Sequence, residues 1–171
     1  MRSVTFTPAA ELTAEERARH ERYMTLALDL VGADHGEIPP GPFAAVIVDR
    51  HSGEVVCEGV NQVGESPTFH GEIVTINACA GVTPKVEWGD LTLYTTAEPC
   101  PMCMSAIAWT GIPEVVYGTS IETLIRFGVN QIGLDSPTVA AAAPFYSGRI
   151  IGGVLKTRAD RMYRRWAARL K

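Results

Sequence analysis

The sequence predicts a three-layer α/β/α protein whose central mixed sheet, of about five strands, is flanked by helices. Apolar runs of strand length alternate along the chain with segments of helical periodicity, which is the pattern of layered α/β folds. The 171 residues, 46% apolar and 20% charged, are enough for one soluble domain with a sizeable core. We therefore interpret residues 1–171 as a single domain.

The first predicted helix follows a short N-terminal segment. Residues 1–11 are expected to form a loosely held arm. Residues 13–16, Thr-Ala-Glu-Glu, match a capping box, and apolar residues then recur at near-helical spacing up to Val31. This amphipathic helix is predicted to end near Gly32, and His35 is expected in a solvent-exposed loop.

Four later segments are predicted as strands. Residues 43–49 and 54–60 are runs of strand length separated by a short polar turn, which favours a hairpin. Residues 91–96 alternate and are rich in β-forming residues, so they are predicted as a central strand. Residues 114–117 form the next strand. The helices between these strands are expected to cover both faces of the sheet.

Two short motifs carry the chemistry: H-G-E at 70–72 and P-C-P-M-C at 99–103. Zinc is bound tetrahedrally by imidazole nitrogen and thiolate sulfur, and three protein ligands leave a fourth position for a water, whose pKa falls to about 7. Cys100 and Cys103 are three residues apart, so both sulfurs face one side of a helix start, where the helix dipole favours thiolates. We predict that His70, Cys100 and Cys103 bind one catalytic Zn²⁺.

Glu72 lies two residues after His70 and is predicted to carry protons beside the metal instead of binding it. The alternative is a redox pair or a structural zinc site, in which Cys57 and Cys79 would complete a four-cysteine set. Both of these cysteines lie in apolar segments and are expected to be small buried hydrophobic residues. The complete H-x-E and P-C-x-x-C pattern therefore favours the catalytic interpretation.

This pattern resembles the zinc-dependent deaminases of the cytidine deaminase superfamily. The segments 41–48, 67–72, 98–103 and 106–109, together with Asn61, are most similar to small bacterial guanine deaminases and nucleoside deaminases. They are similar, at lower specificity, to tRNA adenosine deaminases. The resemblance spans roughly residues 20–130. It implies a cytidine deaminase-like fold, one zinc ion per subunit, and release of ammonia from an amino-substituted heterocycle.

The resemblance also implies the substrate contacts Phe43, Asn61, Gly71 and Trp109. The amide of Asn61 offers a donor and an acceptor to a purine edge, although an asparagine after a strand also commonly caps a turn. The family usually has alanine at the position of Gly71, whose N–H is aimed at a substrate oxygen. Trp109 offers a flat platform for a base, whereas the alternative for a helical tryptophan is a place in the core.

The chain departs from guanine deaminases after the fourth predicted strand. Those enzymes tend to carry an acidic pair after Gly-Phe, whereas this chain has Gly-Val-Asn-Gln at 128–131. An acidic residue in this region can serve the family as a second proton carrier, and Glu122 and Asp135 are nearby candidates. Glu98 is expected to be structural or to support the metal ligands.

The C-terminal segment 134–171 is predicted to contain a lid or arm and a basic helix. Residues 134–144 are rich in alanine and proline, which suits a lid over the pocket, simple packing, or an arm exchanged between subunits. The final helix, from about 158 to 171, has an apolar stripe that includes Trp166. Seven of the 15 lysines and arginines lie in 155–171, which suggests RNA contact, but the net charge of −4 argues against a broad polyanion-binding surface.

We predict a zinc-dependent hydrolytic deaminase of a free nucleobase or nucleoside, with guanine or a related amino-purine as the first choice. The alternatives are a tRNA adenosine deaminase and a non-catalytic zinc-binding interaction protein. The resemblance implies a homodimer. The sequence has no apolar run of membrane-spanning length and no N-terminal secretory core, so we expect a cytoplasmic protein without membrane contact.

Overall fold

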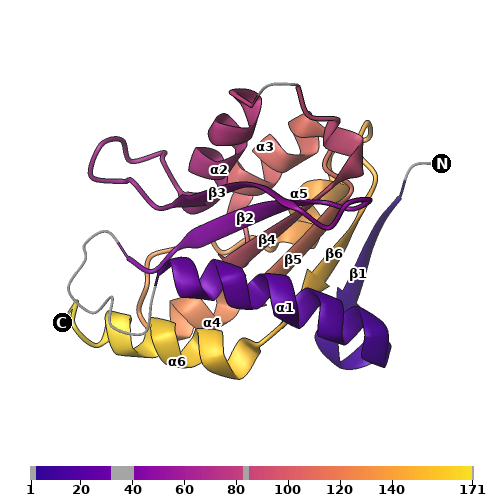
Figure 1. The fold of residues 1–171 in the computed structure, drawn as a ribbon. Helices are drawn as coiled ribbons and strands as arrows, with labels where there is room; N and C mark the ends of the chain where they lie inside the picture. The colour runs from indigo at the N-terminus through magenta and orange to yellow at the C-terminus, as the bar shows by residue number, and fades with distance from the viewer. Residues whose placement is uncertain (1–2, 32–40, 83–84, 171) are drawn as a thin grey trace.

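A computed structural model describes residues 3–31, 41–82 and 85–170 (Figure 1). Its sheet has six strands in the order β1-β6-β5-β4-β2-β3. The strands are β1 (Val4–Pro8), β2 (Ala44–Asp49), β3 (Val55–Val60), β4 (Leu91–Ala97), β5 (Glu114–Thr119) and β6 (Gly148–Gly152). The α-helices are α1 (Ala14–Leu30), α2 (Gly71–Ala80), α3 (Pro101–Thr110), α4 (Ile121–Arg126), α5 (Ser136–Ala141) and α6 (Lys156–Ala167). Short 3₁₀ turns, η1 (Ala9–Glu11) and η3 (Trp88–Asp90), precede α1 and β4.

The sheet is mixed, and its pairing confirms the predicted α/β class. β2 and β3 form the expected antiparallel hairpin, and β4 pairs antiparallel with β2 and parallel with β5. β6 then pairs parallel with both β5 and β1. β4 is buried along its whole length, as predicted for a central strand.

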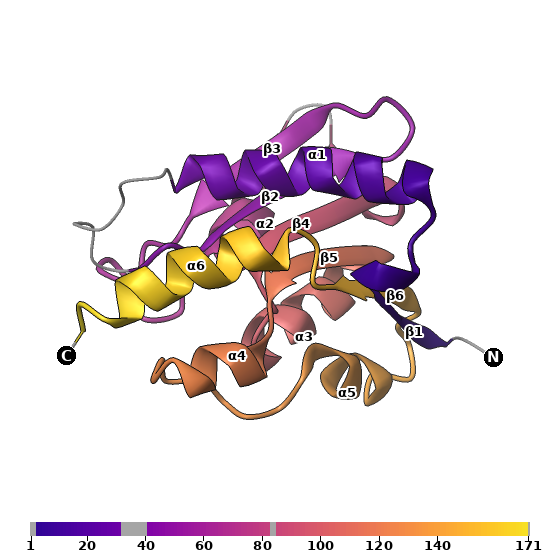
Figure 2. The same ribbon diagram turned by 90° about the horizontal axis from the view of Figure 1, so that it is seen from below.

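Helices cover both faces of the sheet: α1 and α6 lie on one side, and α2, α3 and α5 on the other (Figures 1 and 2). Neighbouring residues of a strand point to opposite faces, so each strand feeds two cores. In β2, Ile47 packs in the core under α2 and α3, whereas Val46 packs in the core under α1. Leu93 and Tyr94 of β4 divide in the same way.

The prediction of a loose N-terminal arm is wrong for the described part of that segment. Residues 4–8 form β1, an edge strand in parallel register with β6 that begins with Val4 opposite Gly148. Arg149 of β6 secures this edge by donating to Thr7 Oγ1 (3.2 Å) and to Glu16 Oε1 (2.7 Å). Its partner strand, β6, lies far along the chain and was not predicted. Residues 4–8 therefore had no predicted strand with which they could pair.

The capping box at the start of α1 is confirmed. The amide of Glu16 donates to Thr13 Oγ1 at 3.2 Å, and the amide of Thr13 donates to Glu16 Oε2 at 3.1 Å. The predicted loop position of His35 lies outside the described residues. Within the described residues, none of the helices combines the length and the apolar character that crossing a membrane requires.

Cys57 and Cys79 are buried, as expected, but they are not separate hydrophobic residues. They form a disulfide that joins β3 to α2, with a Cα–Cα distance of 5.5 Å. α2 packs directly against β3, and this tertiary contact brings the two thiols within bonding geometry. The bond also removes both cysteines from the alternative four-cysteine zinc set.

The segment 134–144 does not form a lid in the structure. It contains α5, which packs against α3 and buries Ala140 in the core. This outcome matches the alternative of simple packing. Part of the wall of the cavity described below comes from the end of the chain, where Trp166 and Leu170 line it.

Candidate metal centre and active site

Two helices on the same face of the sheet begin at the two sequence motifs. His70 is the N-cap of α2, and Cys100 is the N-cap of α3. Pro101 occupies the first turn of α3, where a missing N–H costs no hydrogen bond. The starts of α2 and α3 therefore place His70, Cys100 and Cys103 together.

The three side chains form a compact donor set. His70 Nδ1 lies 3.6 Å from Cys100 Sγ and 3.7 Å from Cys103 Sγ, and all donor atoms lie within 4.8 Å of one another. Typical bond lengths in a tetrahedral zinc site place nitrogen and sulfur ligands about 3.6 Å apart. The residues present thus fit a zinc ion in both donor chemistry and spacing.

Electrostatics at the donor set favour one thiolate even without a cation. Hydrogen bonding from the Cys103 thiol, and then from His70, lowers the pKa of Cys100 to about 4. The same proton sharing, together with burial, raises the pKa of Cys103. The Cys100 thiolate in turn raises the pKa of His70. A divalent cation at this position would displace the remaining protons, because metal binding and deprotonation are coupled.

Glu72 is buried beside the donor set, with only 5% of its surface exposed. Thr95 of β4 donates a hydrogen bond to Glu72 Oε1 at 3.0 Å. Burial, and after it the neighbouring Cys100 thiolate, raises the pKa of Glu72. A carboxyl group with a raised pKa that is held in one orientation is suited to accepting and returning a proton.

His70, Cys100 and Glu72 line one cavity of about 440 Å³, whereas Cys103 is fully buried behind it. Five of the predicted metal-binding, catalytic and substrate-binding residues line it: Phe43, Asn61, His70, Glu72 and Cys100. The other lining residues come from the loop after β3, the segment before α3, the loop after α4 and the end of the chain: Val63, Glu98, Gly128, Val129, Asn130, Gln131, Trp166 and Leu170. Its size falls within the range of small-molecule sites.

A family model that covers both motifs identifies the family of this chain. The model of the cytidine and deoxycytidylate deaminase zinc-binding region matches residues 17–119, which contain both motifs. The chain belongs to this deaminase family.

Two relatives and one solved structure narrow the comparison within the deaminases. The guanine deaminase of Bacillus subtilis (strain 168) is 36% identical over 132 residues, which cover 74% of this chain and 81% of that protein. The tRNA-specific adenosine deaminase of Rickettsia felis is 29% identical over 64% of this chain and 79% of that protein. A crystal structure of a mutant protein in complex with 8-azaguanine has a TM-score of 0.75 and 25% identity, covering 87% of this chain and 84% of that one.

The substrate contacts expected of a deaminase are only partly brought together. Phe43 and Asn61 line the cavity. Asn61 also caps a turn, because its Oδ1 accepts a hydrogen bond from the amide of Val63 at 3.1 Å. Gly71 is not a lining residue; an added Cβ there would lie 3.0 Å from the Cα of Ala44. Glycine at this position therefore lets α2 approach β2 closely, and its role as a substrate N–H donor stays a prediction.

Trp109 does not reach the cavity of its own chain. Its side chain is 77% exposed, so the alternative of a core position is wrong. It stacks on Phe145, with ring centroids 4.6 Å apart. The candidate proton carriers Glu122 and Asp135 are also elsewhere, since both line a second cavity.

Trp166 was missed as a site residue. Its indole ring meets Phe43 edge-on, with centroids 5.6 Å apart, and Phe43 in turn contacts Tyr163 at 4.9 Å. The apolar stripe of the last helix contained the signal, but the stripe alone could not show that part of it faces a cavity instead of the core.

Proposed function

We propose that this deaminase hydrolyses the exocyclic C–N bond of a free amino-purine base or its nucleoside, with guanine as the first choice. His70, Cys100 and Cys103 hold the zinc ion, and Glu72 carries the protons. The observation that supports this most directly is that two members of the donor set, His70 and Cys100, line one cavity together with the buried Glu72. Relatives named as guanine deaminase and a similar fold that binds 8-azaguanine support the choice of a purine.

The residues divide the reaction between them. A zinc ion bound by the donor set supplies Lewis-acid chemistry, because it lowers the pKa of a water molecule. Glu72 accepts a proton from the attacking water and delivers it to the ring nitrogen beside the reacting carbon. It then takes a second proton from the hydroxyl now on that carbon and passes it to the amine, which leaves as ammonia while the carbon becomes a carbonyl. Thr95 holds the Glu72 carboxyl in place through both transfers.

The lining residues suit a flat, uncharged substrate. Phe43 and Trp166 provide aromatic walls, and Asn61, Asn130 and Gln131 provide amides that both donate and accept hydrogen bonds. Among the described lining residues there is no lysine or arginine to pair with a phosphate. A base or nucleoside therefore fits better than a nucleotide.

The test is ammonia release by the zinc-loaded protein from guanine, guanosine, adenine, adenosine, cytosine and cytidine. We expect turnover of an amino-purine. Glu72→Gln should retain zinc and lose about 10²–10⁴-fold in rate, the usual contribution of general acid–base catalysis. Glu58→Gln, an exposed carboxylate on β3, is the matched control and should keep full activity. A zinc-loaded protein inert on every substrate would favour a non-catalytic interaction protein.

A second candidate, adenosine deamination in tRNA, is favoured by the surface of α6. Lys156, Arg158, Arg161, Arg164 and Arg165 are all exposed on the helix that also contributes Trp166 to the cavity. We expect the triple charge reversal of Arg161, Arg164 and Arg165 to leave free-base turnover intact. Activity on a tRNA anticodon stem-loop that this variant loses would move the function to RNA.

We also propose a homodimer. Trp109 and Phe145 form a stacked aromatic pair that is exposed on the surface, a combination enriched at protein interfaces. Trp109 does not line the cavity of its own chain. With this pair at the interface, it would approach the cavity of the second copy instead. Light scattering should give a dimer for the native chain and a monomer for Trp109→Ser.

We also propose a cytoplasmic location, and the Cys57–Cys79 disulfide offers a way to test it. Disulfides are uncommon in reducing compartments. Alkylation of the protein in freshly lysed cells should trap Cys57 and Cys79 as free thiols if the location is cytoplasmic.

A further inference from the structure

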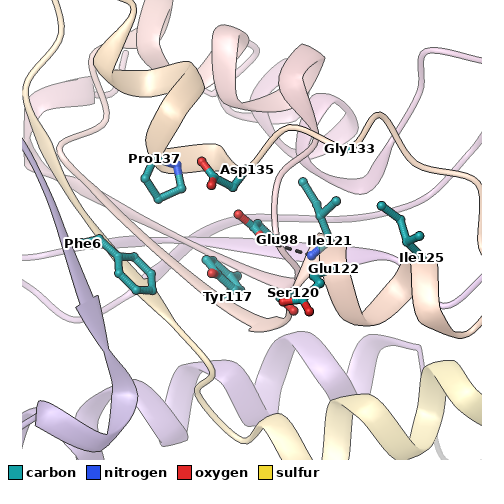
Figure 3. Close-up of a pocket in the computed structure, with 10 residues that line it drawn as sticks. All are labelled: Phe6, Glu98, Tyr117, Ser120, Ile121, Glu122, Ile125, Gly133, Asp135 and Pro137. Carbon is teal, nitrogen blue, oxygen red and sulfur yellow. Dashed lines mark hydrogen bonds between the residues drawn. The ribbon is translucent and has the colours of Figure 1, made fainter.

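Buried hydrogen bonds fix the wall of the reaction cavity, the cavity of about 440 Å³ that Glu72 lines. Glu98 is one example. Its carboxylate accepts from the amide of Ile121 at 2.9 Å, the bond drawn in Figure 3, and from the amide of Ser136 at 2.8 Å. Glu98 also lines the second cavity that Figure 3 shows. The aromatic wall at Phe43 is held in another way, by a side chain that does not itself line the reaction cavity.

This side chain is Tyr163 of α6. It is fully buried, and its ring packs on Phe43 with centroids 4.9 Å apart. Its hydroxyl lies 3.0 Å from the carbonyl oxygen of Pro42 and 2.7 Å from Oγ1 of Thr96. Burying a hydroxyl is unfavourable unless hydrogen bonds replace its water. A phenylalanine would fill the same space without that cost, so the hydroxyl points to a role in holding its partners.

Thr96 of β4 completes the arrangement. Its Oγ1 accepts from the amide of Ala44 at 3.1 Å and lies 3.2 Å from the carbonyl oxygen of Pro42. Burial raises the pKa of Tyr163, so its hydroxyl keeps its proton. Of the two hydroxyl protons, one can bond the other hydroxyl while the second bonds the carbonyl. The backbone is therefore fastened on both sides of Phe43.

The backbone of Phe43 in turn holds Asn61. The amide of Asn61 donates to the carbonyl oxygen of Phe43 at 2.8 Å. Both side chains line the reaction cavity, and both are predicted substrate contacts. A shift of segment 42–44 would thus move the two contacts together.

α6 supports the same segment again at Trp166, about one turn after Tyr163. The indole meets Phe43 edge-on, and an added Cβ on Gly41 would lie 2.7 Å from Cζ2 of Trp166. Tyr163 also belongs to a small core with Val129, which lines the reaction cavity from the loop after α4. The C-terminal helix is therefore packed against two parts of the cavity wall.

We propose that Tyr163 is a positioning residue for the deamination. Its hydroxyl, acting through Pro42 and Thr96, fixes Phe43 and Asn61 where they receive the substrate. This inference rests on the proposed function, because it assigns those two residues to substrate binding. Tyr163 is not among the groups that transfer protons, so its loss should appear in KM and not in kcat.

The test compares two tyrosine-to-phenylalanine variants of the full-length, zinc-loaded protein. Tyr163→Phe should raise KM for the amino-purine about 2–10-fold, the effect of losing one hydrogen bond, with kcat within about twofold of the native value. Tyr146→Phe is the matched control. Its hydroxyl is also buried and donates to the carbonyl oxygen of Ile112 at 2.8 Å, but it lies in the core under α2 and α3. This variant should keep the native KM.

Amide hydrogen exchange measures the same positioning without any substrate. In Tyr163→Phe, Thr96 can still bond the carbonyl of Pro42, so we expect the fold to be kept and the segment to open more easily. The amides of Ala44 and Asn61 should exchange about 2–10-fold faster than in the native chain. Both should exchange at the native rate in Tyr146→Phe.

A double-mutant cycle shows whether Tyr163 acts through Phe43. Added to Phe43→Leu, the change Tyr163→Phe should alter KM by less than about twofold, because the effects of coupled residues do not add. Additive effects on KM would contradict the proposed route.

Other results would also overturn the proposal. Native KM and native exchange rates in Tyr163→Phe would make Tyr163 a packing residue only. A lower kcat with an unchanged KM would place its effect on proton transfer instead of substrate contact. A native chain inert on every substrate would refute the proposed function and the substrate role with it, whereas the exchange rates would still decide whether the hydroxyl holds segment 42–44.

Discussion

The hydroxyl of Thr95 donates to Oε1 of Glu72 across 3.0 Å, and so ties the proposed proton carrier to the central strand of the sheet. The carboxyl group sits at the start of α2, whereas its anchor lies on β4, 23 residues later. The proposed chemistry thus depends on how one helix sits on the sheet as much as on the motif that contains Glu72.

We expect Thr95→Val to lower kcat by about 10–100-fold, the usual cost of losing a group that orients a catalytic or metal-binding side chain. The zinc content should not change, because Thr95 is not one of the three donors. Steady-state kinetics and metal analysis together check this. Thr95→Ser keeps the hydroxyl and should recover most of the activity; a valine variant with full activity would show that the hydrogen bond is unimportant.

Removing one donor should remove the metal. Cys103→Ala leaves two ligands, so we expect loss of stoichiometric zinc and of activity after dialysis, measured by atomic emission and ammonia release. The double variant Cys57→Ala with Cys79→Ala is the control, because these cysteines lie outside the donor set, and it should retain zinc. Retention of one zinc ion by Cys103→Ala would refute the assignment of this ligand.

Trp166→Ala should raise KM more than it lowers kcat. The indole forms part of an aromatic wall with Phe43 but is not among the groups that transfer protons. Loss of binding that is the same in the ground and transition states appears mainly in KM. Trp166→Phe should have a smaller effect. An unchanged KM in the alanine variant would mean that the substrate does not contact this wall.

We expect the protein to lose stability on acidification because of His20. This residue is fully buried. Its Nδ1 shares a hydrogen bond with the Tyr94 hydroxyl at 3.0 Å, and its Nε2 lies 3.4 Å from Nη2 of Arg19. Burial is the main cause that lowers the pKa of His20 below 6.5. Below that pH the unfolded chain takes up a proton that the folded chain resists, so the stabilisation is complete above pH 6.5 and is lost as the pH falls.

Urea unfolding at about pH 7.5 and about pH 5.5 tests this. The native chain should lose more stability between the two than His20→Gln, whose amide does not titrate in this range. The prediction would be wrong if both proteins lost the same amount.

Reducing the Cys57–Cys79 disulfide should destabilise the fold. The bond closes a loop of 22 residues, and a loop of this size is worth about 3 kcal/mol in the chain-entropy model. We expect a lower midpoint of urea unfolding in the presence of a strong reductant. Cys57→Ala with Cys79→Ala should show the lower midpoint in both conditions, and an oxidised native chain with no advantage over this variant would contradict the estimate.

Local signals in the sequence were enough for most of the fold and for the metal motif. The capping box, the hairpin at β2 and β3, and the central strand β4 each depend on residues close together in the chain. The donor set could also be predicted from short motifs, because Zn²⁺ binds few residue types and these occur here at the spacing of a zinc site. These features follow from local geometry.

The tertiary structure decided the features that join distant parts of the chain. β1 required β6 as its partner, Cys57 met Cys79 only when α2 packed on β3, and Trp109 faced solvent although its helical position allowed a core. Glu122 and Asp135 line a second cavity, whereas Trp166 lines the cavity that contains Glu72. Periodicity shows whether a residue lies on the apolar or the polar face of its helix or strand. Only the packing of whole elements determines which surface that face contacts.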